Sequence, residues 1–236
     1  MATVSRSARL RTVMTWPIGI AVVSWRYMWR TMPVHRMEEP GTRADLPDPA
    51  YGSPGDQTLE MGVGPMLHRL YTVQITGSSM TPAALIDLVA DRLNQAAPEV
   101  AVFRKTGGTS SGLRLGDEFL VRMPGPWDGP VRVVRRDLTA FRFATMDGHL
   151  EAGEIEFRAR QDGDALRFEI ESWARAGDRL ASLLYNKLRL AKEIQLNMWS
   201  HFCVRTAALA GGRPRGGITI STRWLAWPEP RGEARA

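Results

Sequence analysis

Residues suited to chemistry are few in this sequence. His149 stands between Asp147 and Glu151 in a segment expected to be a loop. Imidazole titrates near neutral pH and often serves as a general acid or base. His149 is therefore a catalytic candidate. A single histidine in a loop often has only a structural role, and that simpler interpretation stays open. Cys203 is the only cysteine, which excludes an internal disulfide, and it falls within an expected helix where a buried thiol is unreactive.

Motifs that mark particular reactions are missing from the sequence. It has no nucleophile elbow, no glycine-rich phosphate loop and no paired-carboxylate motif. Its histidines and acidic residues do not cluster at metal-ligand spacing. We therefore expect neither a metal nor a cofactor, and the catalytic residues, if the protein is an enzyme, stay unknown.

The positive charge is concentrated at the N-terminus. The net charge is +6, and residues 1–37 contain six arginines and no acidic residue. The rest of the chain holds 25 basic and 25 acidic side chains. A nucleic-acid-binding domain carries its excess basic charge on the folded body. The sequence therefore predicts no nucleic-acid partner.

An amphipathic segment lies within this basic arm. Fourteen uncharged residues separate Arg11 from Arg26, too few to cross a bilayer of ~30 Å. Tryptophans beside arginines are typical of a helix lying on an anionic membrane surface. A signal peptide and a helix that folds back on the body are the alternatives. The residues expected to contact a membrane or partner are Trp16, Trp25, Arg26, Trp29 and Arg30.

Composition divides the chain into four parts. Residues 38–65 are rich in proline, glycine and acidic residues, and we interpret them as a linker without a packed core. The arm at 1–37 precedes this linker, a folded domain at 66–226 follows it, and 227–236 form a flexible tail. No run of 18 apolar residues occurs and cysteine is scarce, so we expect a cytoplasmic protein with peripheral membrane contact through its arm.

The folded domain alternates apolar and polar residues, as in an antiparallel sheet with one covered and one wet face. Thr81 and Pro82 mark the start of a helix. Pro98 either ends this helix or starts a short second turn. A long helix is expected over residues 178–210, which contain neither glycine nor proline and precede Gly211. Seven strands are expected at residues 68–76, 100–105, 115–123, 130–136, 139–146, 151–161 and 165–175.

This order of elements resembles the helix-grip fold of the START, birch-pollen-allergen (Bet v 1) and polyketide-cyclase superfamily, also called SRPBCC. Four segments resemble more specifically a family of bacterial and plant proteins catalogued as DUF1990. The resemblance implies an α+β fold in which a curved seven-stranded antiparallel sheet wraps a long C-terminal helix, with an N-terminal helical arm. It implies no established activity. The four segments are GDEFLVRMPGPWDGPVRVV (116–134), FRFATMDGHLEAGEIEFRAR (141–160), LRFEIESWAR (166–175) and LRLAKEIQLNMWSHF (188–202).

A curved sheet around a helix leaves a space that inward-facing side chains would make apolar. Such concave sites are the usual binding sites for small hydrophobic molecules. The stiff loop at 123–130 would hold Trp127 at the mouth of the space or against the sheet. The residues expected to line the ligand site are Phe119, Val121, Met123, Trp127, Phe141, Phe143, Thr145, Ile155, Phe157, Phe168, Ile170, Ser172, Leu184, Leu188 and Met198.

The sequence thus favours a protein that binds a small hydrophobic molecule or lipid, brought to an anionic membrane surface by its arm. Two alternatives stay open. A cyclase, dehydratase or isomerase would need at least two titratable groups inside the cavity. A partner-binding protein would have a solid core instead. A cavity of a few hundred Å³ beneath the long helix would favour the ligand-binding functions.

Overall fold

The computed structural model describes residues 32–48, 52–99, 101–109, 111–122, 128–177 and 189–227. It describes the side chains of all of these except 189–194. Several residues with an expected role lie outside these ranges: Trp16, Trp25, Arg26, Trp29, Arg30, Met123, Trp127, Leu184 and Leu188.

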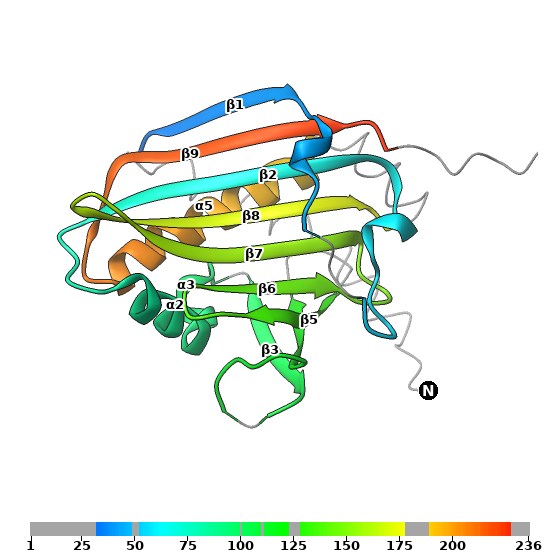
Figure 1. Ribbon diagram of the computed structural model, residues 1–236, viewed down its shortest axis with the longest axis horizontal. Helices are drawn as coiled ribbons and strands as arrows, with labels where there is room; N and C mark the ends of the chain where they lie inside the picture. Colours follow the sequence, from blue (N-terminus) through cyan, green and yellow to red (C-terminus); the bar gives the residue numbers. More distant parts are fainter. Residues whose placement is uncertain are drawn as a thin grey trace, which may run out of the picture.

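A nine-stranded sheet forms the body of the protein (Figure 1). Its order is β1-β9-β2-β8-β7-β6-β5-β4-β3. The β1–β9 pair is parallel and the other pairs are antiparallel, so the sheet is mixed. The strands are β1 (Val34–Pro40), β2 (Val63–Thr76), β3 (Val102–Gly107), β4 (Glu118–Arg122), β5 (Asp128–Arg136), β6 (Ala140–Thr145), β7 (Glu151–Asp162), β8 (Ala165–Ala176) and β9 (Arg213–Leu225).

The seven expected strands are present as β2 to β8, but the expected total of seven and the purely antiparallel pairing are wrong. β9 lies between β1 and β2, and β1 then adds a parallel edge. The alternation in β9 begins only at Ile218, after Gly216 and Gly217, whose φ angles are 72° and 92°. Glycine tolerates such angles, so this irregular start is accommodated where the pairing register with β2 shifts.

The start of α2 and the end of α5 lie where local signals predict. The Thr81 hydroxyl accepts a hydrogen bond from the Ala84 N–H at 3.2 Å, and Pro82 starts α2 (Pro82–Asp91), which α3 (Leu93–Ala96) follows. α5 (Arg189–Leu209) ends just before Gly211, whose φ is 69°. The expected helix started at residue 178, but 178–188 lie outside the described residues. α5 is not C-terminal either, because β9 follows it.

The core lies between the inner face of the sheet and the helices. In Figure 1, α5 runs behind β2 and β8, while α2 lies at the end of β6. Phe157 stacks on Phe141 with ring centroids 4.7 Å apart, and it also contacts Phe202 of α5 at 5.2 Å. All three rings are fully buried. Each such side chain stabilises the fold by about 1.5–3 kcal/mol relative to its exposed state, and these contacts fix α5 over the sheet.

Residues 38–65 differ from the expected unpacked linker. Their first residues belong to β1, so the boundary expected after residue 37 falls inside a strand. Two 3-10 turns follow, η1 (Arg43–Asp45) and η2 (Leu59–Met61). The Gln57 N–H donates to the Thr145 carbonyl at 2.7 Å, and Leu59 is buried. Proline and glycine make this segment irregular, but within its described residues, 38–48 and 52–65, these contacts with the sheet hold Gln57 and Leu59 in packed positions.

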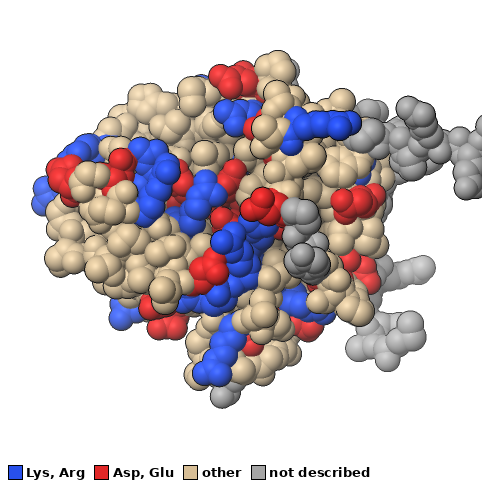
Figure 2. Space-filling view, viewed as in Figure 1, with Lys and Arg blue, Asp and Glu red and all other residues tan. Residues whose placement is uncertain are grey.

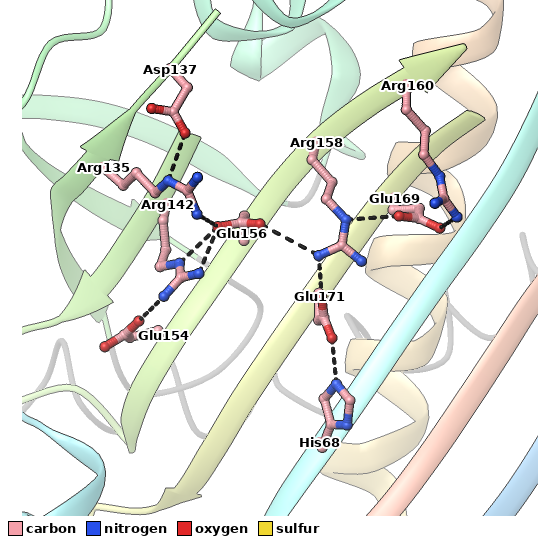
Figure 3. Close-up of polar contacts among 10 residues, drawn as sticks. All are labelled: His68, Arg135, Asp137, Arg142, Glu154, Glu156, Arg158, Arg160, Glu169 and Glu171. Carbon is pink, nitrogen blue, oxygen red and sulfur yellow. Dashed lines mark hydrogen bonds and ion pairs between the residues drawn. The ribbon is translucent and has the colours of Figure 1, made fainter. Parts of the chain in front are cut away.

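The outer face of the sheet was expected to be wet, yet many of its charged side chains are buried. Figure 2 shows basic and acidic side chains side by side across this face, and Figure 3 shows the ion pairs that join them. Arg158 contacts Glu156, Glu169 and Glu171. The exposed fraction of Glu169 is only 2%. Neighbouring charged side chains therefore shield one another from solvent. Their ion pairs compensate for the hydration that these groups lose on burial.

Candidate functional site

A partly enclosed cavity of about 70 Å³ lies between the inner face of the sheet and α5. Pockets for drug-sized ligands occupy roughly 300–1,000 Å³, so this cavity is smaller than the one expected from the sequence. A water needs about 10–15 Å³ of such space. The cavity therefore has room for a cluster of waters or for a molecule of a few non-hydrogen atoms.

One wall of the cavity is apolar. Phe103, Val121 and Val131 come from β3, β4 and β5, while Met198 and Trp199 come from α5. Their side chains offer no hydrogen bonds to a ligand except for the indole N–H of Trp199. Of the residues expected from the sequence, those that line the cavity are Val121, Phe143, His149, Thr145, Ile155, Ser172 and Met198.

Other expected lining residues are absent from the wall because they fill the core beside it. Phe119, Phe141, Phe157, Phe168 and Ile170 are buried in the main hydrophobic cluster but do not border the cavity. The rings of Phe141, Phe143 and Phe157 pack against one another, with centroids 4.7–6.1 Å apart. Aromatic packing therefore occupies much of the space that was expected to be empty.

A polar wall faces the apolar one. The Arg69 Nη1 donates to Gln195 Oε1 at 2.9 Å, and Gln195 Nε2 donates to Glu151 Oε1 at 2.8 Å. All three residues line the cavity. The amide of Gln195 is thereby held between a cation and a carboxylate, with its oxygen toward the cation.

Arg69 and Glu151 were missing from the expected site, although the sequence contains a signal for Arg69. Tyr71 and Val73 are apolar residues at alternate positions of the expected strand at 68–76, and Arg69 shares their parity. In the structure Arg69 is 2% exposed, on the same face as Tyr71. A charged residue at an inward position of an otherwise apolar strand face is a candidate for a binding or catalytic group. The contact between Arg69 and Gln195 becomes apparent only when the register of β2 and the position of α5 are known.

Thr145, expected as a ligand contact, has its hydroxyl engaged in the structure. Its Oγ1 accepts from the Gly153 N–H at 2.9 Å and lies 2.9 Å from the Gln57 carbonyl, to which it can donate. Gly153 has a φ of 153°, and a Cβ there would come within 2.0 Å of the Trp173 carbonyl oxygen. These contacts make Thr145 and Gly153 parts of the framework of the cavity.

His149 lies between β6 and β7 and borders the cavity. Its Nδ1 is 2.9 Å from the backbone N–H of Glu151, which donates to it in one tautomer. A Cβ on Gly129 would lie 2.9 Å from its Nε2, so a larger residue at position 129 would require this ring to move. Burial lowers the pKa of His149 below its ordinary value, more than the nearby Glu151 raises it. The ring is therefore a neutral imidazole near pH 7.

Because its pKa is lowered by folding, His149 should make the protein less stable in mild acid. Below about pH 6.5 the unfolded chain binds a proton at this residue that the native state binds only at lower pH. The free energy of unfolding should thus fall between pH 7.5 and 5.5, and H149Q should weaken that dependence. Urea unfolding at several pH values measures both. H35Q is the control. If the free energy of unfolding of H149Q depends on pH as strongly as that of the wild type and H35Q, the buried neutral imidazole is contradicted.

Two further buried groups resist ionisation. Burial raises the pKa of Tyr71 to about 12, although the Arg69 charge opposes the rise. Burial also raises the pKa of the Cys203 thiol, which agrees with the expectation of an unreactive cysteine. Neither group is a nucleophile at neutral pH.

The described part of the chain contains no group of three or more His, Cys, Asp or Glu residues placed to hold a metal ion. Within the same residues, no helix is both long enough and apolar enough to cross a membrane.

Fold and site together define an α+β protein with a small cavity, apolar on one side and polar on the other, between a mixed sheet and a helix. Residues 95–205, just under half of the chain, match the model of a family described as "Domain of unknown function (DUF1990)". This match runs from α3 into α5 and confirms the resemblance seen in the sequence. Over this segment the chain is similar to that family. No curated protein matches the chain.

Solved structures that resemble parts of this chain share little sequence with it. The KanY protein is 12% identical with a TM-score of 0.45, over 64% of this chain and 99% of its own. Ara h 8.0201 is 8% identical with a TM-score of 0.43, over 61% and 99%. The di-domain ARO/CYC StfQ from the steffimycin biosynthetic pathway is 10% identical with a TM-score of 0.43, over 62% and 52%. These values are low, so the function has to be inferred from the cavity itself.

Proposed function

We propose that this protein binds a small molecule with an apolar body and a polar end in the cavity between its sheet and α5. The observation that carries the proposal is the pairing of two unlike walls: Phe103, Val121 and Met198 on one side, and the Arg69–Gln195 pair on the other. A site of this kind obtains affinity from apolar burial and orientation from a few polar groups.

The cavity volume narrows the size of the ligand. At about 70 Å³ it is about half as large as an apolar cavity of about 150 Å³ that binds benzene. A compact molecule fits this space better than a lipid chain does. Contact of the N-terminal arm with an anionic membrane is a separate proposal, tested by comparing liposome flotation with and without residues 1–37.

Acid–base catalysis of the cyclase, dehydratase or isomerase kind is a second candidate function. It requires titratable groups inside the cavity, and both His149 and Glu151 line the wall that also holds Arg69. A neutral imidazole can accept a proton from a carbon acid or donate a hydrogen bond to its oxygen. Exchange of the hydrogens next to a carbonyl in bound probes in D₂O would favour this function, and probes returned unchanged would favour binding alone.

Filling the cavity should weaken ligand binding. Ala174 of β8 lines the cavity, and in A174L a leucine side chain would occupy most of its free space. We expect the affinity for butanoate, butanamide or butan-1-amine, measured by ligand-detected NMR titration of the full chain, to fall at least about tenfold.

A208L is the matched control, because Ala208 is an exposed residue of α5 and adds the same atoms away from the cavity. It should bind the probes as the wild type does. The proposal fails if A174L folds and binds as well as A208L, or if none of the three probes binds the wild type.

A further inference from the structure

We propose that the ligand of this cavity is a small organic acid whose carboxylate binds at Arg69. The inference rests on the small-molecule function proposed above and names the chemical class of its ligand. It starts from the placement of one cation. Arg69 extends from the middle of the inner face of β2 and is 2% exposed, so its guanidinium lies deep in the protein.

The residues beside Arg69 create a polar end in an otherwise apolar row. Arg69 pairs in register with Thr222 of β9 on one side and with Ser172 of β8 on the other. The same row continues across the sheet through Ile155 of β7 and Phe143 of β6. Side chains of one such row point to the same face. The row therefore changes from hydroxyl and guanidinium groups at β9, β2 and β8 to apolar groups at β7 and β6.

This gradient matches a molecule with a charged oxygen group at one end and a short apolar body. Arg69, Ser172, Ile155 and Phe143 all border the cavity, so both the polar and the apolar part of the row face its space. A guanidinium presents several N–H donors in a planar fork and binds carboxylates through two parallel hydrogen bonds. Burial strengthens such a charge-assisted contact because little water competes for it.

Gln195 marks the position that the carboxylate would take. Its Oε1 accepts from Arg69 Nη1 at 2.9 Å and thus already places a partially negative oxygen at the guanidinium. A carboxylate oxygen carries more negative charge than an amide oxygen and would bind there more strongly. Gln195 belongs to α5, so its side chain can turn aside without any change in the sheet.

Glu151 carries a negative charge, but it lies nearer to solvent than Arg69 does. The cavity should therefore favour an anionic ligand over a cationic one. It lies at the start of β7 and is half-buried, whereas Arg69 is fully buried. Charges interact more strongly where water is excluded, so the buried Arg69 acts more strongly on a ligand than the half-buried Glu151 does. Glu154, which also borders the cavity, is paired with Arg142 at 3.0 Å. Glu151 is nearer to solvent, where its Oε1 accepts from Gln195 Nε2.

The test compares three probes of nearly equal size on the full chain at pH 7.5: butanoate, butanamide and butan-1-amine. They carry a negative, a neutral and a positive end on the same apolar body. We expect the wild type to bind butanoate about tenfold more tightly than butanamide, because a charged hydrogen bond replaces a neutral one. R69Q should remove this preference and leave the butanamide affinity within about threefold, whereas R69K should retain part of it.

Two further variants keep the test decisive if R69Q does not fold. E151Q removes the opposing charge and should tighten butanoate binding severalfold with little effect on butanamide. R104Q, which removes an exposed arginine of β3, should change neither affinity. Equal binding of all three probes, or tightest binding of butan-1-amine, would overturn the inference while the small-molecule function stands. Binding of none of them would overturn both.

Discussion

Replacement of Glu156 with alanine is expected to lower the free energy of unfolding by about 3–5 kcal/mol, because it leaves a buried arginine without its main carboxylate partner. Glu156 and Arg142 are 4% and 6% exposed. Glu156 Oε2 accepts from Arg142 Nε at 2.9 Å and lies 2.8 Å from Nη2, while Arg135 Nη1 donates to it at 3.2 Å (Figure 3). Arg142 would keep only Glu154 as a carboxylate partner among the contacts of this face.

Urea unfolding of E156A and of a matched surface variant measures this effect. E39A is a suitable control, since Glu39 is exposed and its ion pair with Arg223 spans 3.6 Å. Exposed pairs of this kind contribute about 0–1 kcal/mol. The double variant E156A/R142M should recover part of the lost stability, because an apolar side chain replaces the stranded charge. Equal destabilisation by E156A and E39A would show that burial of this network has no energetic consequence.

The network also shows what the sequence could and could not predict. The alternation of Glu and Arg in β7 and β8 correctly placed these residues opposite the apolar side chains of the core. It did not predict their burial, because burial depends on which strands pair and in which register. Glu156 stands directly opposite Glu171, a repulsive arrangement that Arg158 resolves by contacting both carboxylates. This three-way contact depends on the pairing register of β7 and β8, which the alternation of Glu and Arg does not reveal.

For the cavity, the apolar wall was more predictable than the polar one. Parity within strands identified Val121, Phe143 and Ile155 because one face of a strand packs as a unit. The same parity points Arg69 inward, but a single charged residue in an apolar pattern does not reveal its partner. Gln195 lies 126 residues further along the chain, on a helix whose rotation is set by core packing. The site therefore depends on long-range contacts that local patterns do not encode.

The edge strands were missed for a different reason. β1 has exposed side chains at nearly every position, so it carries no alternating apolar signal. It becomes a strand because β9 offers an edge whose backbone groups pair with it from Val34 to Pro40. β9 is itself interrupted by Pro214, Gly216 and Gly217, which indicate a loop when neighbouring strands are unknown.

Replacement of Asp117 with alanine is expected to cost about 3–4 kcal/mol of stability, because several partly buried donors lose one shared, buried acceptor together. The Asp117 side chain is 1% exposed; Lys105 Nζ lies 2.6 Å from it, and the backbone N–H groups of Thr109 and Arg114 donate at 2.8 and 2.7 Å. Burial opposes ionisation, but these contacts outweigh it and lower the pKa of Asp117. Thermal and urea unfolding of D117A measure the loss.

The sign of this pKa shift gives a second way to check the same residue. Because folding lowers the pKa of Asp117 from 3.8, its stabilisation is fully present above that value and is lost as the pH falls below it. The difference in stability between wild type and D117A should therefore be constant from pH 7 to 5 and shrink toward pH 3. D137A removes an exposed carboxylate paired with Arg135 and should cost less than about 1 kcal/mol. A D117A defect no larger than that of D137A would mean that the loop between β3 and β4 does not depend on this carboxylate.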